Sequence, residues 1–252
     1  EIAFQSTYQG SQSRIMMICT EEKNLTMANG KEFSTGNHPV EMLVPMLHLR
    51  NAGFHIDVFT PTGKSAKIEG WAMPAEDKNV MSLYAQYEEQ FNHPKSLSEF
   101  ANQHMNDSSD FTAIFIPGGH GAMNGLPENQ DLKKIIHWSF QKDLHMLAIC
   151  HGPAALLSAN LNQDGEFLYS GYSMAVFPDS MDKQTPMIGY MPGQLTYQFG
   201  SKLSELGVNI VNKKADKTCH QDRKLITGAS PQAANDFGIL SATALLQSKN
   251  LL

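Results

Sequence analysis

The chain has 252 residues, of which 41% are hydrophobic and 17% are charged. Its length suits one large domain or a domain with a small insert, and its composition excludes a disordered, collagen-like or coiled-coil protein. Its 19 Lys and Arg residues against 25 Asp and Glu give a net charge of −6, which argues against a nucleic-acid partner. No apolar run approaches the roughly 20 residues needed to cross a bilayer, so we expect no membrane partner.

Three cysteines, Cys19, Cys150 and Cys219, are widely spaced along the chain. An odd number at this spacing suits neither a disulfide framework nor a Cys-x-x-Cys metal site. We therefore expect a reducing compartment, with the cytoplasm as the simplest location.

Short apolar runs alternate with longer amphipathic ones, a pattern typical of strands joined by crossover helices. We predict strands at 15–19, 55–59, 112–116, 145–149, 208–211 and 224–227, and helices at 39–51, 131–141, 193–206 and 231–248. Continuously apolar strands predict a mainly parallel α/β sheet with helices on both faces. The polar stretch 61–110 is too long for a plain crossover, so we expect a small inserted helical subdomain there.

The segment around Cys150 carries the strongest chemical signal. An apolar strand leads directly into Cys150, His151, Gly152 and Pro153, and residues that favour a helix follow. A sharp strand-to-helix turn would lift the Cys150 side chain above the carboxyl edge of the sheet, where open α/β folds bind ligands. The helix N-terminus would then lower the pKa of the thiol, to roughly 4 to 7. The alternative is a structural cysteine buried at a strand end.

The other two cysteines have different surroundings. Cys219 is also followed by a histidine, His220, but its neighbours are polar and no apolar strand precedes it. We expect Cys219 to be a surface-loop thiol and His220 to be exposed. Cys19 ends the first strand, and we expect it to pack in the core.

Two further segments could complete a site at the same sheet edge. Gly118 and Gly119 follow a buried strand and would let backbone N–H groups approach a ligand, as an oxyanion site requires. The alternative is a tight turn with His120 at the surface. Glu41 falls in the first turn of the helix predicted at 39–51, where a carboxylate also simply stabilises the helix dipole. A function for Glu41 therefore depends on its reaching Cys150.

Three segments of the chain resemble a known family. Residues 117–122, 150–155 and 177–193 are similar to the motifs of the bacterial heat-shock chaperone and glyoxalase III branch of the ThiJ/PfpI superfamily. The resemblance spans about 14–246. It implies a flavodoxin-like core at 14–60 and 111–252, a small subdomain at 61–110 beside the active-site cleft, and a homodimer.

The resemblance also assigns residues to the site. It places the nucleophile at Cys150, its histidine at His151, the supporting acid at Asp182, a cysteine-contacting carboxyl group at Glu41, and oxyanion donors at Gly119 and His151, beside Gly118. Related chaperones carry a metal on two histidines and a glutamate, but the matching residues here are Arg50, His55 and Tyr87. Because arginine and neutral tyrosine are poor ligands, we expect no resident metal and no other cofactor.

The function implied by the resemblance is that of a glutathione-independent glyoxalase. Such an enzyme converts methylglyoxal and related 2-oxoaldehydes to lactate-type 2-hydroxy acids. Cys150 would form a hemithioacetal, and Glu41 or His151 would move a proton between the two carbons. Removal of glycation adducts from proteins would use the same attack.

Two other functions stay open at this point. A cysteine aminopeptidase or amidase would use the same cysteine and histidine. A holdase chaperone would offer exposed methionines between Met174 and Met191 to unfolded proteins, unless these residues only fill the core.

Overall fold

A central sheet organises the chain in the computed structural model, which describes residues 4, 6–105, 110–162 and 165–251. Within these ranges seven strands form the sheet in the order β10-β11-β7-β6-β1-β4-β5. The strands are β1 (Arg14–Ile18), β4 (His55–Thr60), β5 (Lys95–Ser96), β6 (Phe111–Ile116), β7 (His145–Ile149), β10 (Cys219–Asp222) and β11 (Leu225–Gly228). All neighbours pair in parallel except β10 and β11, and the predicted mainly parallel α/β sheet is confirmed.

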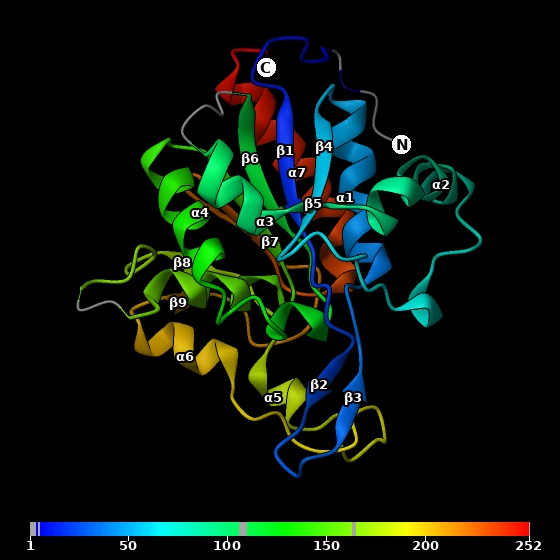
Figure 1. Cartoon of the computed structure of the whole chain (residues 1–252), viewed down its shortest axis with the longest axis vertical. Coiled ribbons are helices and arrows are strands. Elements are labelled where there is room, and N and C mark those ends of the chain that lie inside the picture. The colour runs from blue at the N-terminus through cyan, green and yellow to red at the C-terminus, as the bar shows by residue number, and fades with distance from the viewer. Residues whose placement is uncertain (1–3, 5, 106–109, 163–164, 252) are drawn as a thin grey trace.

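Helices cover both faces of this sheet (Figure 1). Alternate residues of β1 point to opposite faces, so Ile15 and Met17 pack in one core and Met16 and Ile18 in the other. The first core includes residues of α1 (Pro39–Asn51) and α7 (Ala234–Ser248), which pack against each other. The second includes residues of α4 (Gln130–Gln141) and of the 3₁₀ helix η4 (Gly152–Asn160). None of the described helices has the length and apolar content needed to span a bilayer.

Several predicted elements differ in the structure. The strand predicted at 208–211 is only β9 (Asn209–Ile210), which pairs with β8 (Ser173–Met174) outside the main sheet. The helix predicted at 193–206 is shortened to α6 (Phe199–Glu205), because turns occupy the residues before it. The surface loop predicted around Cys219 is wrong: polar strand β10 adds to the sheet edge through backbone hydrogen bonds and half-buries this thiol.

A hairpin that the sequence did not reveal extends from the end of the sheet. Strands β2 (Asn24–Thr26) and β3 (Glu32–Ser34) pair antiparallel and lie beside the segment that carries the four-residue helix α5 (Asp179–Asp182), as Figure 1 shows. The side-chain amide of Asn29 at the hairpin turn donates to the carbonyl of Pro192 at 3.0 Å. This hydrogen bond connects the hairpin to the segment that follows α5.

The segment 61–110 contains helical elements and one strand. Its described elements are the 3₁₀ turn η1 (Gly70–Ala72), α2 (Lys78–Asn92), β5, α3 (Leu97–Glu99) and a π-helical turn, η2 (Phe100–His104). Since β5 pairs with β4, part of this segment extends the main sheet.

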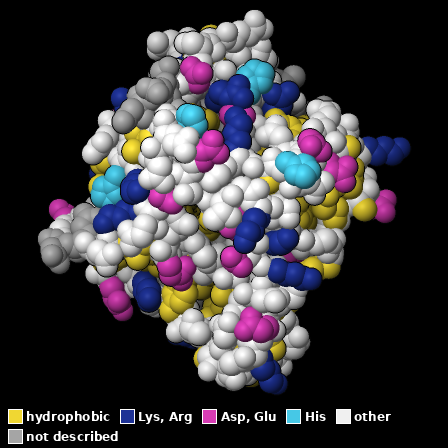
Figure 2. All heavy atoms as spheres, in the orientation of Figure 1, with side chains coloured by type: hydrophobic (Ala, Val, Ile, Leu, Met, Phe, Trp, Pro, Cys, Tyr) yellow, Lys and Arg dark blue, Asp and Glu magenta, His cyan; other side chains and the backbone are white. Residues whose placement is uncertain are grey.

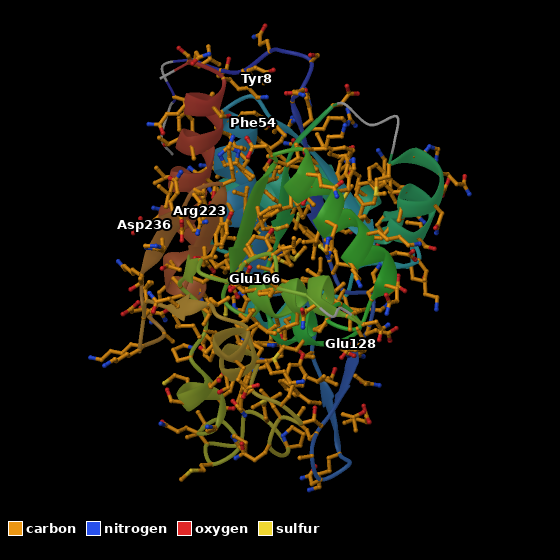
Figure 3. All side chains as sticks on the ribbon, turned by 90° about the vertical axis from the view of Figure 1, so that its left-hand side faces the viewer. Tyr8, Phe54, Glu128, Glu166, Arg223 and Asp236 are labelled. Atoms are coloured by element: carbon orange, nitrogen blue, oxygen red, sulfur yellow. The ribbon has the colours of Figure 1, made fainter. Side chains whose placement is uncertain are left out.

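At the opposite end of the molecule, the N-terminal residues cover the start of β4. The Tyr8 ring stacks on Phe54 with centroids 5.5 Å apart, and its backbone N–H donates to the carbonyl of Ala52 at 2.9 Å (Figure 3). On the face shown in Figure 2, charged side chains of both signs are interspersed. This distribution agrees with the expectation, drawn from the composition, that positive charge is not concentrated in one place.

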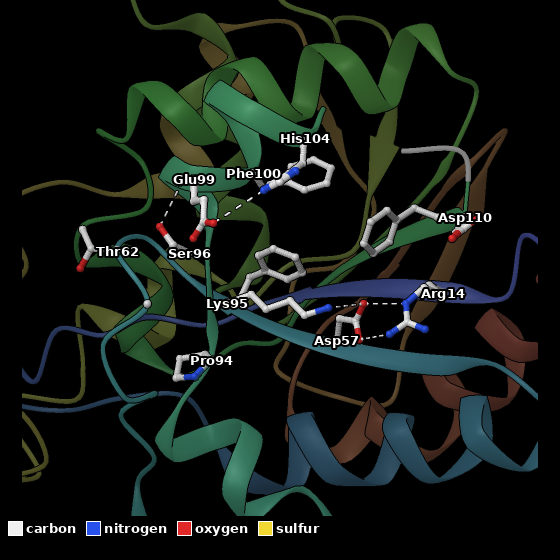
Figure 4. Close-up of a pocket in the computed structure, with 13 residues that line it drawn as sticks. Arg14, Asp57, Thr62, Pro94, Lys95, Ser96, Glu99, Phe100, His104 and Asp110 are labelled. Atoms are coloured by element: carbon white, nitrogen blue, oxygen red, sulfur yellow. Dashed lines mark hydrogen bonds and ion pairs between the residues drawn. The ribbon is translucent and has the colours of Figure 1, made fainter. Parts of the chain in front are cut away.

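The buried carboxylate of Asp57 forms ion pairs across three neighbouring strands, β1, β4 and β5, toward one edge of the sheet. Asp57 of β4 accepts hydrogen bonds from Nε and Nη2 of Arg14 at 2.8 and 2.7 Å, and Nζ of Lys95 lies 3.1 Å from its Oδ2 (Figure 4). These cations hold the pKa of Asp57 below its usual value against the opposing effect of burial. The three residues line a cavity of about 640 Å³ whose walls also include Phe59 and Phe100.

We predict that Asp57→Asn lowers the free energy of unfolding by about 1–3 kcal/mol, because the carboxylate that pairs with Arg14 and Lys95 is lost. Since the pKa of Asp57 is depressed in the folded state, its stabilisation is present above the unfolded pKa near 4 and is lost on further acidification. Urea unfolding of the wild type and of Asp57→Asn should therefore show a difference in the free energy of unfolding at pH 7, and this difference should become smaller toward pH 3.

The control for this prediction is Asp131→Asn, which breaks the Asp131–Lys134 pair on the surface of α4. It should change stability by less than about 0.5 kcal/mol. Equal losses for the two variants would contradict the structural role of Asp57.

Candidate active site

Cys150 lies on a strained turn at the end of β7. Its φ is 62°, in the left-handed region that non-glycine residues rarely occupy. Two backbone hydrogen bonds hold it: its N–H donates to the carbonyl of Gly228 at 2.8 Å, and its carbonyl accepts from the N–H of Phe177 at 2.9 Å. The predicted sharp turn is thus present, although the helix after it, η4, is 3₁₀ rather than α.

The turn brings the side chains of Cys150 and His151 together. Sγ of Cys150 lies 3.4 Å from Nδ1 of His151. The other ring nitrogen, Nε2, donates to Oδ2 of Asp182 at 2.7 Å. With its Nε2 proton directed at a carboxylate, His151 turns the lone pair of Nδ1 toward the thiol. A cysteine, a histidine and an aspartate are therefore connected in series.

A second histidine shares the same aspartate. Nε2 of His120 donates to Oδ1 of Asp182 at 2.8 Å, and the rings of His120 and His151 are 4.0 Å apart. The alternative of a surface His120 is wrong, because the turn after β6 points its ring inward, under Tyr190. The position of His120 follows from the strand order. Because β6 and β7 are neighbours in the sheet, the turns that follow them, which carry His120 and His151, meet at its carboxyl edge.

The charges of the two histidines act on Asp182 and on each other. The imidazoles hold the pKa of Asp182 far below its usual value, despite the opposing effect of burial. The pKa of His120 is lowered by burial and by the nearby His151. Asp182 is therefore ionised at neutral pH and can stabilise a proton on one imidazole, but not readily on both.

Glu41 reaches the thiol from the first turn of α1. Its side chain is fully buried, and a Cβ added at Gly118 would lie 2.8 Å from Oε2 of Glu41 and 2.7 Å from Cβ of Cys150. Only glycine fits in this gap. Neither Glu41 oxygen has a partner in full hydrogen-bond geometry among the described residues.

Burial raises the pKa of Glu41 well above its usual value, and the nearby Glu69 adds to this shift. His38 offers no counter-charge, although its Nδ1 lies 3.9 Å from Oε1 of Glu41. Burial and the two histidines of the candidate site, His151 and His120, lower the pKa of His38 to about 4. Burial without a counter-charge from His38 therefore favours the protonated, neutral form of Glu41.

The predicted lowering of the Cys150 pKa is wrong. The thiol is 2% exposed, and its pKa is raised well above the usual value, first by burial and then by Glu41 and Asp182. The N–H of His151 at the turn does lower the pKa, as the sequence argument expected, but this effect is smaller. The resting site holds a protonated thiol beside a base rather than a free thiolate.

The glycine-rich turn lies against the same groups. Gly119 has a φ of 89°, which a side chain would strain, and its backbone N–H interacts with the carboxyl group of Glu41. The N–H of His151 interacts with the thiol of Cys150. The structure thus brings Gly118 and the N–H of His151 next to Cys150, and the N–H of Gly119 next to Glu41.

The residues that match the metal site of related chaperones do not suit a metal. Nη1 of Arg50 donates to Nδ1 of His55 at 3.0 Å, so a cation occupies the nitrogen that would bind the ion. Burial raises the pKa of Tyr87, which keeps its phenol neutral. In the described ranges His120, His151 and Asp182 are close enough to share an ion, but their hydrogen bonds to one another already use the facing atoms.

A cysteine on a strained turn, a histidine–aspartate pair and a buried glutamate at the carboxyl edge of a parallel sheet are features of a cysteine-dependent α/β enzyme. The model of the DJ-1/PfpI family matches residues 33–168. The chain belongs to this family.

Curated relatives support the assignment across the whole chain. Protein/nucleic acid deglycase 1 of Escherichia coli K12 is 45% identical over 245 residues, which cover 97% of this chain and 85% of the relative. Protein/nucleic acid deglycase HchA of Escherichia coli O157:H7 matches equally well.

Solved structures share the fold at lower identity. Glyoxalase III from Candida albicans superimposes with a TM-score of 0.70 at 23% identity and covers 92% of this chain and 98% of its own. The 24 kDa rapid encystment protein of Francisella tularensis has a TM-score of 0.74 at 22% identity, with coverage of 92% and 99%. At these identities the likeness concerns the fold.

We predict that Cys150 contributes no thiolate absorbance at 240 nm near pH 7, because its pKa is raised. The measurement is the difference spectrum between the wild type and Cys150→Ser during a titration from pH 5 to 9. The variant subtracts Cys19 and Cys219, and burial raises the pKa of Cys219 to about 12. A Cys150 thiolate that is complete by pH 6 would contradict the buried, carboxyl-flanked site.

Proposed function

We propose that this protein is a cofactor-independent enzyme that converts methylglyoxal and related 2-oxoaldehydes to 2-hydroxy acids, and that it also removes early adducts of these aldehydes from proteins. The arrangement of Cys150 between His151 and the neutral Glu41 carries the proposal. The relatives named as protein/nucleic acid deglycases support it.

In the first step, His151 takes the thiol proton as Cys150 attacks the aldehyde carbon. Asp182 stabilises the imidazolium that forms. The new C–S bond gives a hemithioacetal, and its oxygen takes the proton of Glu41. The N–H groups of Gly119 and His151 are placed to stabilise the oxyanion while it lasts.

In the second step, Glu41 is a carboxylate and removes the proton from the former aldehyde carbon. The oxygen of the neighbouring carbonyl takes the proton of the His151 imidazolium, so an enediol forms, and Glu41 then returns the carbon-bound proton to the neighbouring carbon. Loss of the hydroxyl proton to Glu41 gives a thioester. His151 takes a proton from water as the water attacks the thioester, and it passes this proton to the leaving thiolate as the 2-hydroxy acid is released. No glutathione, redox partner or metal enters this balance.

The enclosure of the site supports small substrates. Cys150, Glu41 and His151 are all buried, which suits a three-carbon aldehyde or the tip of a modified side chain better than a peptide backbone. This favours the glyoxalase and deglycase reactions over an aminopeptidase or amidase.

A holdase function also has one observation in its favour. Met187 and Ile188 are 83% and 80% exposed, although Met174 and Met191 at the ends of the same segment are buried in the core. The exposed pair would supply the adaptable apolar surface for unfolded proteins. Client binding and the homodimer stay predictions.

We predict that purified wild-type protein produces lactate from methylglyoxal and that Cys150→Ser lowers kcat at least 100-fold, because a hydroxyl is far harder to ionise than a thiol. Proton NMR of the reaction mixture measures the lactate. Cys219→Ser is the matched control and should keep full activity. Lactate formation that persists in Cys150→Ser but stops in Cys219→Ser would refute the assignment of the nucleophile.

A further inference from the structure

A group of aromatic side chains surrounds the outer side of the candidate active site. The ring of Tyr190 lies 5.8 Å from His120, 5.5 Å from Phe33 of β3 and 5.9 Å from Trp71 of η1. Trp71 also lies 6.1 Å from the ring of His38, close to Glu41. Three separate segments thus contribute rings to one enclosure, yet Trp71 is 70% exposed. Its ring can therefore contact a ligand that enters from solvent.

A carboxylate with no assigned role lies within this enclosure. Glu69, two residues before Trp71, is 6% exposed and accepts a hydrogen bond from Oγ1 of Thr35 through Oε1 at 2.6 Å. Its other oxygen, Oε2, is buried and has no partner in full hydrogen-bond geometry among the described residues, although the backbone N–H of Gly36 interacts with the carboxyl group. None of the ion pairs in the described ranges involves Glu69. A buried carboxylate oxygen without a partner is costly unless a ligand supplies one.

The backbone fixes Glu69 next to the catalytic turn. The N–H of Glu69 donates to the carbonyl of Asn37 at 3.0 Å, and the N–H of the adjacent His38 donates to the carbonyl of Gly118 at 3.0 Å. Only this short segment therefore separates Glu69 from the glycine-rich turn. Burial raises the pKa of Glu69 itself. Its charge adds to the raised pKa values of Glu41 and Tyr190 and partly offsets the lowering of the His120 pKa.

A groove leads from solvent to this position. It has a volume of about 530 Å³, and its walls include Thr35, Glu69 and Trp71. Lys23 and Lys67 also line it, whereas Glu69 is the single acidic residue among the described lining residues. Nζ of Lys67 donates to Oγ of Ser65 at 3.1 Å rather than to Glu69. Among the described lining residues, Glu69 is thus the one carboxylate that a cation in the groove could contact, and it lies beside the active site.

We propose that Glu69, Trp71 and Tyr190 form a subsite for the cationic group of a glycated arginine or lysine side chain whose aldehyde-derived carbon lies at Cys150. Aromatic faces and a carboxylate together are the chemistry that recognises guanidinium and ammonium groups. In such adducts the charged nitrogen is bonded directly to the aldehyde-derived carbon, so both must lie in one enclosure. Free methylglyoxal and its cysteine adduct carry no such charge.

This inference rests on the proposed function, because it names which adducts the same site prefers. The test compares kcat/KM for lactate release from three probes: methylglyoxal alone, its Nα-acetylarginine adduct and its Nα-acetylcysteine adduct. We expect Glu69→Gln to lower the ratio of kcat/KM for the arginine adduct to that for methylglyoxal about tenfold, since a charge-assisted contact is lost. The ratio for the cysteine adduct should stay within about twofold.

Two more variants complete the design. Trp71→Leu should lower the arginine ratio in the same direction, and because the Trp71 side chain is exposed, the substitution should leave the protein folded. Glu76→Gln, an exposed charge change in the same segment, is the matched control and should leave all three rates unchanged.

The outcomes separate the subsite from the function. A wild-type protein that releases lactate from none of the probes would overturn the proposed function. A wild type that turns over all three, with an arginine ratio that Glu69→Gln does not change, would overturn the subsite alone. That second result would also follow if adducts reacted only after releasing free aldehyde.

Discussion

The left-handed backbone of Cys150 is the constraint on which the rest of the site depends. In an extended strand neighbouring side chains point to opposite faces, so Cys150 and His151 could not meet. With a φ of 62°, the thiol and the imidazole lie 3.4 Å apart. A non-glycine residue in this conformation costs about 1–3 kcal/mol, which the surrounding fold must offset. The hydrogen bonds to Gly228 and Phe177 fix the strained peptide units from both sides.

The surroundings of the two carboxyl groups of the site drive their pKa values in opposite directions. Asp182 accepts from two imidazoles and its pKa is lowered, whereas Glu41 is fully buried with no cation beside it among the described residues and its pKa is raised. Carboxyl groups whose pKa values are driven apart can divide acid and base roles between them. In the proposed reaction Asp182 stabilises charge throughout, and Glu41 moves protons. Burial thus makes the thiol a poor resting nucleophile but gives the hemithioacetal step its acid.

The same burial explains the proposed preference for small or side-chain substrates. A free thiolate at a helix N-terminus would react with many electrophiles, whereas a protonated and enclosed thiol reacts only where His151 can take its proton. Glu69 would add a second level of selection, because it lies within the same enclosure and would favour substrates that carry a cationic group.

Local patterns predicted the features that local geometry sets. The apolar strand, the turn at Cys150 and the helix from Pro39 follow from short-range residue preferences, and the structure has all three. The thiol pKa was predicted with the wrong sign, because it depends on burial and on Glu41, which lies more than one hundred residues earlier in the chain. His120 was ambiguous for the same reason, since its partner Asp182 is 62 residues away. Strand β10 was missed because backbone pairing at a sheet edge needs no apolar sequence.

The proposed reaction depends on a protonated Glu41 at rest, and infrared difference spectroscopy can detect this proton. The spectrum of wild-type protein minus that of Glu41→Gln at pH 7 isolates this one carboxyl group from Glu69 and Asp182. We predict a positive band in the carbonyl region of protonated carboxylic acids, with no matching carboxylate band. A difference spectrum that contains only carboxylate bands would show that Glu41 is ionised at rest, and Glu41 could then not supply the proton for the hemithioacetal.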